Sequence, residues 1–189
     1  MSEGSVVAIV SPSWGGPHAF PKVYAKGLEV LKEDLGLEVR EMSHARASQS
    51  YLRRNPQMRA QDINDAFLDP EVDAVIASVG GDDSVRALPF LDLEGILSHH
   101  KVLMGFSDTT TLLTYLSLNG LVTYHGPSVM AGIAQMRNYP RQLEHLRDLF
   151  FHPQDKYAYR PADAFNEGYP DWADDENRGR VLRKKRSAG

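Results

Sequence analysis

Residues 101–118 read KVLMGFSDTTTLLTYLSL, and this stretch joins a short apolar run to a turn and a second apolar segment. The run at 101–104 is predicted to be a buried strand. The segment at 109–118 is predicted to be the helix that follows it. Ser107 lies between the two, in Gly105-Phe106-Ser107-Asp108. A buried strand that runs through a tight turn into a helix is typical of α/β proteins.

The same alternation of apolar strands and helices extends along most of the chain. The predicted strands cover residues 6–10, 37–42, 74–79, 101–104 and 121–124. The predicted helices cover residues 21–35, 57–68, 84–88, 109–118 and 140–150. Such alternation implies parallel crossovers, so we predict an α/β fold: an open parallel sheet with helices on both faces. Ligands bind such sheets beyond the carboxyl ends of the strands.

The composition of the chain changes near residue 160. Its 189 residues suit one domain with its own core, and we assign residues 1–160 to it. Residues 155–160 are a candidate for a last strand. From residue 161 to 189 the sequence is rich in Pro, Gly and charged residues with few apolar anchors, which predicts a linker or a disordered tail.

Composition excludes several classes of function. With 21 Lys+Arg against 25 Asp+Glu, the net charge of -4 gives no field that attracts nucleic acid or anionic lipids. The absence of cysteine excludes disulfides, a thiolate nucleophile and Cys-ligated metal sites. The N-terminus lacks the basic region of a signal peptide, and no stretch has the length of a membrane span. We expect a cytoplasmic protein with no nucleic-acid or membrane partner.

Ser107 is the first candidate for a catalytic residue. A serine at the turn between a buried strand and a helix resembles a nucleophile elbow, where the backbone N–H of Asp108 can face an oxyanion. The pattern departs from G-x-S-x-G, because Asp108 and Thr109 follow the serine, which disfavours an ordinary α/β-hydrolase. The alternative is that Ser107 or Asp108 only caps the helix.

Gly80-Gly81-Asp82-Asp83 follows the neighbouring strand and is the second candidate. Glycines let a backbone approach a ligand closely, so one amide of this loop is a candidate for a second oxyanion donor. The alternative is a tight turn in which Asp83 or Ser84 caps the next helix. Gly15-Gly16 has neither G-x-G-x-x-G spacing nor a P-loop lysine, which argues against a nucleotide cofactor.

Metal and base candidates are few. His125 is the histidine that ends a predicted strand at the ligand-binding edge, and it is either a base for Ser107 or a structural residue. We expect it to lie more than about 3.2 Å from the serine hydroxyl. The spacing of Asp62, Asp65, Asp69 and Asp73 lacks the alternation of a calcium-binding loop. These aspartates are predicted to form a solvent-exposed helix face and a turn. The basic run at 183–186 is read as an exposed tail.

Several motifs in fixed order resemble those of one family. They are Ser11-Pro12-Ser13, the stretch DINDAFLDP at 62–70, Gly80-Gly81, Arg86 with Leu88-Pro89 and Leu91-Asp92, GFSDTT at 105–110, and His125-Gly126-Pro127. Together they resemble the LD-carboxypeptidase family of serine peptidases. GGDDS at 80–84 and DTT at 108–110 are more similar to its microcin C immunity branch than to its murein tetrapeptide carboxypeptidases.

The resemblance implies a Ser-His-Glu triad in which Ser107 is the nucleophile and the amides of Asp108 and Gly81 hold the oxyanion. In the family, the histidine and glutamate belong to a C-terminal domain, and no residue here matches them. We therefore expect residues 1–160 to be the nucleophile domain and 161–189 to lead towards a second domain outside this chain. Gly80, Asp82 and Trp172 are candidates for substrate contacts. Trp172 would stack on a base or, alternatively, anchor the linker.

The implied activity is hydrolysis of an amide bond in an aminoacyl- or peptidyl-nucleotide or an LD-muropeptide. The family also implies a homodimer in the full-length form, with neither a metal nor an organic cofactor. A non-catalytic module that binds the same small-molecule or peptide ligand is the main alternative. A local dyad of Ser107 and His125 is a third reading.

Overall fold

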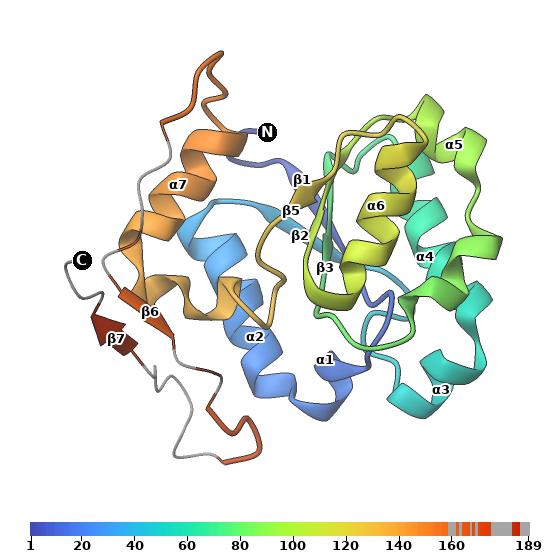
Figure 1. Cartoon of the computed structure of the whole chain (residues 1–189), viewed down its shortest axis with the longest axis horizontal. Coiled ribbons are helices and arrows are strands. Elements are labelled where there is room, and N and C mark those ends of the chain that lie inside the picture. Colours follow the sequence, from blue (N-terminus) through green and yellow to red (C-terminus); the bar gives the residue numbers. More distant parts are fainter. Residues whose placement is uncertain (159–161, 163, 167, 169, 175–182, 186–189) are drawn as a thin grey trace.

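The computed structural model describes residues 1–158, 162, 164–166, 168, 170–174 and 183–185. Its centre is a five-stranded parallel sheet in the order β2-β1-β3-β4-β5, which confirms the predicted open α/β fold (Figure 1). The strands are β1 (Val6–Val10), β2 (Glu38–Glu41), β3 (Ala74–Ala77), β4 (Val102–Gly105) and β5 (Tyr124–His125). Their carboxyl ends meet at one edge, where the loops after β1, β3 and β4 come together.

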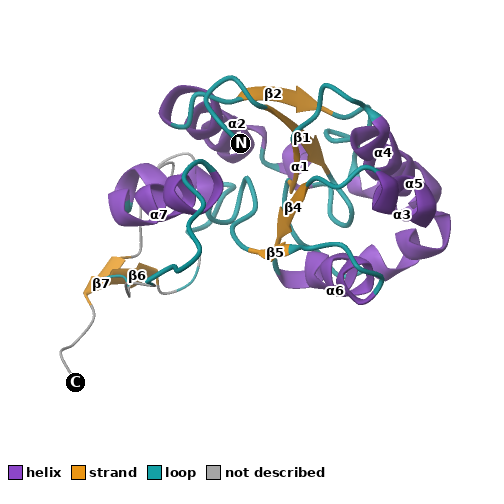
Figure 2. Cartoon of the chain, turned by 90° about the horizontal axis from the view of Figure 1, so that it is seen from above, coloured by secondary structure: helices purple, strands orange, loops and turns teal. Residues whose placement is uncertain are grey.

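Helices cover both faces of the sheet. The α-helices are α1 (Gly16–Ala19), α2 (Pro21–Glu29), α3 (Gln49–Arg54), α4 (Pro56–Leu68), α5 (Leu93–Ser98), α6 (Thr110–Leu118) and α7 (Pro140–Phe150). The 3-10 and π segments are η1 (Val30–Asp34), η2 (Ser84–Phe90), η3 (Ser107–Thr109) and η4 (Ile133–Asn138). Figure 2 shows α2 and α7 on one side of the sheet and α4, α5 and α6 on the other.

The core is split into two layers by the pleat of the strands. In β1, Val7 and Ile9 pack in the layer with α2 and α7, whereas Ala8 and Val10 pack with α4 and α6. Successive side chains of a strand point to opposite faces, so a continuous apolar run fills both layers. Because all four side chains are fully buried, the central strands are fixed in place and the loops at their ends are held on a rigid support.

Helix α2 lies against the loop that follows β5, and Gly27 is the contact point. A Cβ at Gly27 would lie 2.4 Å from the carbonyl oxygen of Val129 and 2.5 Å from its Cγ1. We expect Gly27→Ala to lower the free energy of unfolding by up to about 2 kcal/mol, because overpacking costs about 1–3 kcal/mol and alanine's better helix propensity offsets about 1 kcal/mol of it. Urea unfolding measures this, with the exposed Thr114→Ala as the control. Equal stability of the two variants would show that the contact can relax.

The structure differs from the sequence prediction at several elements. Helix α3 is not predicted from the sequence because the stretch is polar, and Leu52 is its single buried residue. The strand predicted at 155–160 is wrong for residues 155–158, which form no strand. The stretch predicted to be a linker or tail contains an antiparallel pair, β6 (Ala164–Asn166) and β7 (Arg183–Lys185). None of the helices in the described part is long and apolar enough to cross a membrane.

Candidate active site

Ser107 occupies an unusual backbone conformation at the carboxyl end of β4. Its φ is 61°, and it is the single non-glycine residue with a positive φ in the described part of the chain. A left-handed conformation costs a residue with a Cβ on the order of 1–3 kcal/mol, so the surrounding structure must impose it. Ser107 is exposed and begins η3, which leads into α6. This is the geometry of a nucleophile elbow.

The turn around Ser107 depends on close packing of its flanking residues. A Cβ at Gly105 would lie 2.7 Å from Cγ2 of the buried Thr109, so the chain folds back tightly at this point. Phe106 is extended, with φ -157° and ψ -175°. The abrupt change from an extended residue to a left-handed one turns the chain from the strand into the helix and leaves the serine side chain at the sheet edge.

Gly80 lies directly against Ser107. A Cβ at Gly80 would be 2.8 Å from Ser107 Cβ, 3.0 Å from its Oγ and 3.3 Å from the amide nitrogen of Asp108. The loop after β3 therefore meets the turn after β4, as the sequence predicts from their places at the carboxyl ends of strands. A residue larger than glycine would displace one of these two segments.

Two backbone N–H groups near Ser107, those of Gly81 and Asp108, donate to no acceptor in the described part of the chain. In the part of the chain that the structure describes, no acceptor receives a hydrogen bond from the N–H of Gly81. The N–H of Asp108 lies in the first turn of η3, where backbone N–H groups lack intrahelical acceptors. Because Gly81 follows Gly80 and Asp108 follows Ser107, both amides lie at the same corner of the sheet edge.

The side chain of Asp108 joins the two loops. The backbone N–H of Ser84 donates to Asp108 Oδ2 at 2.8 Å, and the Ser84 hydroxyl donates to the Asp108 carbonyl oxygen at 2.8 Å. Neither Ser107 nor Asp108 caps its own helix, and Asp83 accepts no capping bond at the start of η2. The capping alternatives drawn from the sequence are therefore wrong in detail, because Asp108 caps the neighbouring helix instead.

Ser13 is a site residue that the sequence reasoning missed. Its buried hydroxyl oxygen accepts hydrogen bonds from the N–H groups of Asp82 at 3.0 Å and Asp83 at 3.4 Å. The neighbouring Trp14 N–H donates to the Gly80 carbonyl oxygen at 3.2 Å. The loop after β1 therefore shapes the Gly80-Gly81 loop, and the signal for it was the Ser11-Pro12-Ser13 motif.

His125 does not pair with Ser107. It is exposed at the end of β5, and its ring packs edge-on against Phe106 with centroids 6.4 Å apart. No hydrogen bond joins it to the serine hydroxyl among the described residues, which is the outcome expected from the sequence. The local dyad is thus not formed in this structure.

Trp172 packs beside the α1–α2 corner. Its ring is 5.6 Å from that of Phe20, which in turn is 5.7 Å from Trp14. These contacts connect Trp172, through a row of aromatic rings, to the loop that supports Gly80. Asp82 is exposed at the tip of its loop.

The Asp62 carboxylate is buried, so the predicted solvated face is wrong at this position. It accepts hydrogen bonds from the His44 backbone N–H at 2.9 Å and pairs with His44 Nδ1 at 2.8 Å. Burial raises the pKa of Asp62, although the two His44 contacts act in the opposite direction. The pair joins the loop after β2 to α4 and makes no hydrogen bond to Ser107.

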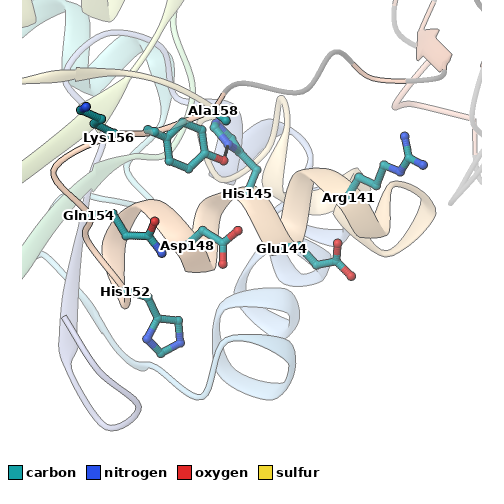
Figure 3. Close-up of a pocket in the computed structure, with 9 residues that line it drawn as sticks. Arg141, Glu144, His145, Asp148, His152, Gln154, Lys156 and Ala158 are labelled. Atoms are coloured by element: carbon teal, nitrogen blue, oxygen red, sulfur yellow. Dashed lines mark hydrogen bonds between the residues drawn. The ribbon is translucent and has the colours of Figure 1, made fainter.

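Other polar clusters lie elsewhere. A pocket of about 370 Å³ lies along α7, and Glu144, His145, Asp148 and Tyr157 are among the residues that line it. Figure 3 shows the first three of these side chains on α7. Ser107 and Gly81 do not line the pocket. The described residues hold no group of three or more His, Cys, Asp or Glu side chains arranged to bind a metal ion.

Several carboxypeptidases are similar in sequence to this chain. A putative carboxypeptidase of Streptomyces coelicolor is 38% identical over 158 residues, which are 82% of this chain and 49% of that protein. A probable murein peptide carboxypeptidase of Bacillus subtilis is 32% identical over 151 residues, or 79% of this chain and 46% of that protein. The microcin C7 self-immunity protein MccF of Escherichia coli is 36% identical over 78 residues, covering 41% of this chain and 23% of that protein.

Solved structures show the same fold. The MccF-like protein of Streptococcus pneumoniae, solved in complex with AMP, superposes with a TM-score of 0.82 at 26% identity, over 96% of this chain and 55% of that chain. The chain spans about half the length of the curated relatives that it matches over most of its own length. The family model described as the LD-carboxypeptidase N-terminal domain matches residues 7–126. The chain therefore belongs to the LD-carboxypeptidase family.

Proposed function

We propose that this chain is the nucleophile-bearing half of a serine carboxypeptidase that hydrolyses an amide bond through Ser107. The observation that carries the proposal is the left-handed Ser107 at the strand-to-helix turn, with Gly80 packed against it. A strained serine that is exposed at the ligand-binding edge has no evident structural purpose. The family's relatives are named as carboxypeptidases, which supports this reaction class.

In the proposed reaction, Ser107 Oγ attacks the scissile carbonyl carbon and its proton passes to a histidine oriented by a glutamate. The N–H groups of Asp108 and Gly81 donate to the oxyanion of the tetrahedral intermediate. The amine then leaves with the proton from the histidine, and water hydrolyses the acyl-enzyme ester. No residue of this chain is assigned to the histidine or the glutamate, which we place in a second domain reached through residues 161–189.

For the substrate we propose an aminoacyl- or peptidyl-nucleotide in preference to an LD-muropeptide. The GGDDS and DTT motifs resemble the microcin C immunity branch, and a pneumococcal relative of 26% identity was solved with AMP bound. Trp172 is the proposed stacking partner for the base, with Gly80 and Asp82 beside the acyl group. The proposal includes a cytoplasmic location and a homodimer in the full-length form, both implied by the family resemblance.

Slow covalent labelling tests the nucleophile in this chain. We expect a fluorophosphonate to modify Ser107 over a long incubation and not quickly, because without a base the serine keeps an ordinary high pKa and relies on the oxyanion donors alone. Peptide mass spectrometry locates the adduct. Ser107→Ala should remove it, whereas Ser117→Ala, an exposed serine on α6, should not.

A non-catalytic binding module is the second candidate, and the lack of a histidine hydrogen-bonded to Ser107 in the described part favours it. Such a module would bind AMP in calorimetry and yet give no Ser107 adduct at any incubation time. Labelling of several exposed serines at similar rates would also count against the proposed nucleophile.

A further inference from the structure

Arg59, on α4, is a fully buried arginine near the candidate active site. Its Nη1 donates to the carbonyl oxygen of Pro12 at 2.9 Å and to Asp83 Oδ1 at 2.7 Å, and its side chain has 0% exposure. Burying a guanidinium costs several kcal/mol unless it is well paired. Here Nε and Nη2 have no hydrogen-bond partner among the described residues, so the pairing is incomplete.

Incomplete pairing argues against a role in stability alone. Apolar side chains of similar volume often replace buried ion pairs without loss of stability, and they avoid the cost of unpaired buried donors. What an apolar side chain could not supply is the contact that Nη1 makes with two separate loops. The contribution that is specific to Arg59 is therefore the link that its Nη1 makes between Pro12 and Asp83.

The two loops joined by Arg59 are those that shape the Ser107 site. Pro12 lies in the loop after β1 and Asp83 in the loop after β3. The same loops meet again at Ser13, whose hydroxyl accepts from the Asp83 N–H at 3.4 Å. Next to Asp83, the N–H of Ser84 donates to Asp108 Oδ2 at 2.8 Å. A short series of contacts thus runs from the arginine to the residue that follows Ser107.

We propose that Arg59 is a positioning residue for the active site. By holding Asp83 and Pro12, it fixes the loop after β3 so that the Gly81 N–H keeps its place beside Ser107. It acts through the backbone and does not touch the substrate. This inference rests on the proposed function, since it assigns a purpose to the placement of the Gly81 amide.

Three variants test the contact: Arg59→Met, Arg59→Lys and Asp83→Asn. Arg137→Met is the matched control, because Arg137 also bridges two elements through carboxylates, with bonds of 2.6 Å to Asp34 and 2.7 Å to Glu33. The rate of fluorophosphonate modification of Ser107 is measured together with the urea midpoint. Amide proton and nitrogen shifts of Gly81 and Asp82 report the loop directly.

We expect Arg59→Met to slow Ser107 modification by about 10²-fold, the loss typical when one oxyanion donor is displaced. Asp83→Asn should give a smaller loss, and the double variant should be no slower than Arg59→Met, because the two residues act through one contact. Arg59→Lys should restore part of the rate. The Gly81 and Asp82 amide shifts should move in the Arg59 variants and stay unchanged in Arg137→Met.

Unchanged modification rates and unchanged Gly81 shifts in the Arg59 variants would overturn the inference. So would equal losses in Arg59→Met and Arg137→Met, because these would reflect general destabilisation. If Arg59→Met does not fold, Arg59→Lys and Asp83→Asn decide by the same criteria. Failure of the proposed function looks different: Ser107→Ala would then leave modification unaffected, while the Gly81 shifts would still show whether Arg59 holds the loop.

Discussion

A chimera that joins residues 1–189 of this chain to the C-terminal part of the Streptomyces coelicolor relative should hydrolyse aminoacyl-nucleotide amides, and Ser107→Ala should lower its kcat by about 10⁶-fold. The relative is 38% identical to this chain over a region that covers 49% of the relative. The rest of the relative provides the part that this chain does not match. A triad acts as a unit, so loss of the nucleophile removes almost all of the acceleration. Release of the nucleotide product, followed by chromatography, measures kcat.

The chain without that half is the first control for this experiment. It should show the residual effect of the oxyanion donors and of substrate binding, roughly 10³- to 10⁴-fold over water. Adding the second half as a separate polypeptide should restore turnover if the halves dock. Robust turnover by the lone chain that is lost on His125→Ala would contradict the proposal, because it would show that a base within this chain serves Ser107.

Much of the fold was predictable because its signals are local. The apolar run of β1 and the change from strand to helix around Ser107 follow from residues that are close in sequence. The parallel sheet follows from their alternation, and the meeting of the loops after β3 and β4 follows from the sheet. The place of Ser107 at a turn between a strand and a helix can therefore be predicted from the sequence, whereas its positive φ cannot.

The site contacts that the sequence did not predict join residues that are far apart in the sequence. Arg59 and Asp83 are separated by 24 positions, and Ser13 and Asp82 by 69, so no local pattern reveals either pair. Helix α3 was missed for a different reason. It is polar and begins at a serine cap, with a single buried leucine, so the apolar periodicity that predicts helices is absent.

The residue type of Asp108 did not decide whether the Ser107 turn is a candidate catalytic site or only a helix cap. An aspartate at the start of a helix most often caps that helix. Here its carboxylate accepts from the Ser84 N–H of the neighbouring loop, since β3 and β4 are adjacent in the sheet. The capping interaction exists, but it joins two loops at the site. Its effect is to fix the backbone of the residue whose N–H faces the proposed oxyanion.

Gly80→Ala should abolish most of the Ser107 reactivity while leaving the fold intact. The added Cβ would lie 2.8 Å from Ser107 Cβ and 3.3 Å from the Asp108 nitrogen. Neither atom can move by rotation about a side-chain bond, so the Ser107 turn or the loop after β3 must shift. We expect the rate of fluorophosphonate modification to fall by about 10²- to 10³-fold, as when an oxyanion donor is lost.

Gly27→Ala is the matched control, because it also forces a Cβ against backbone, but at the α2 contact with Val129. It should reduce the urea midpoint and leave the rate of Ser107 modification in the folded protein unchanged. Gly80→Ala should show the opposite pattern, with a large loss of rate and a smaller loss of stability. A Gly80→Ala variant that reacts at the parent rate would mean that the loop after β3 does not supply an oxyanion donor, and the assignment of Gly81 would have to be withdrawn.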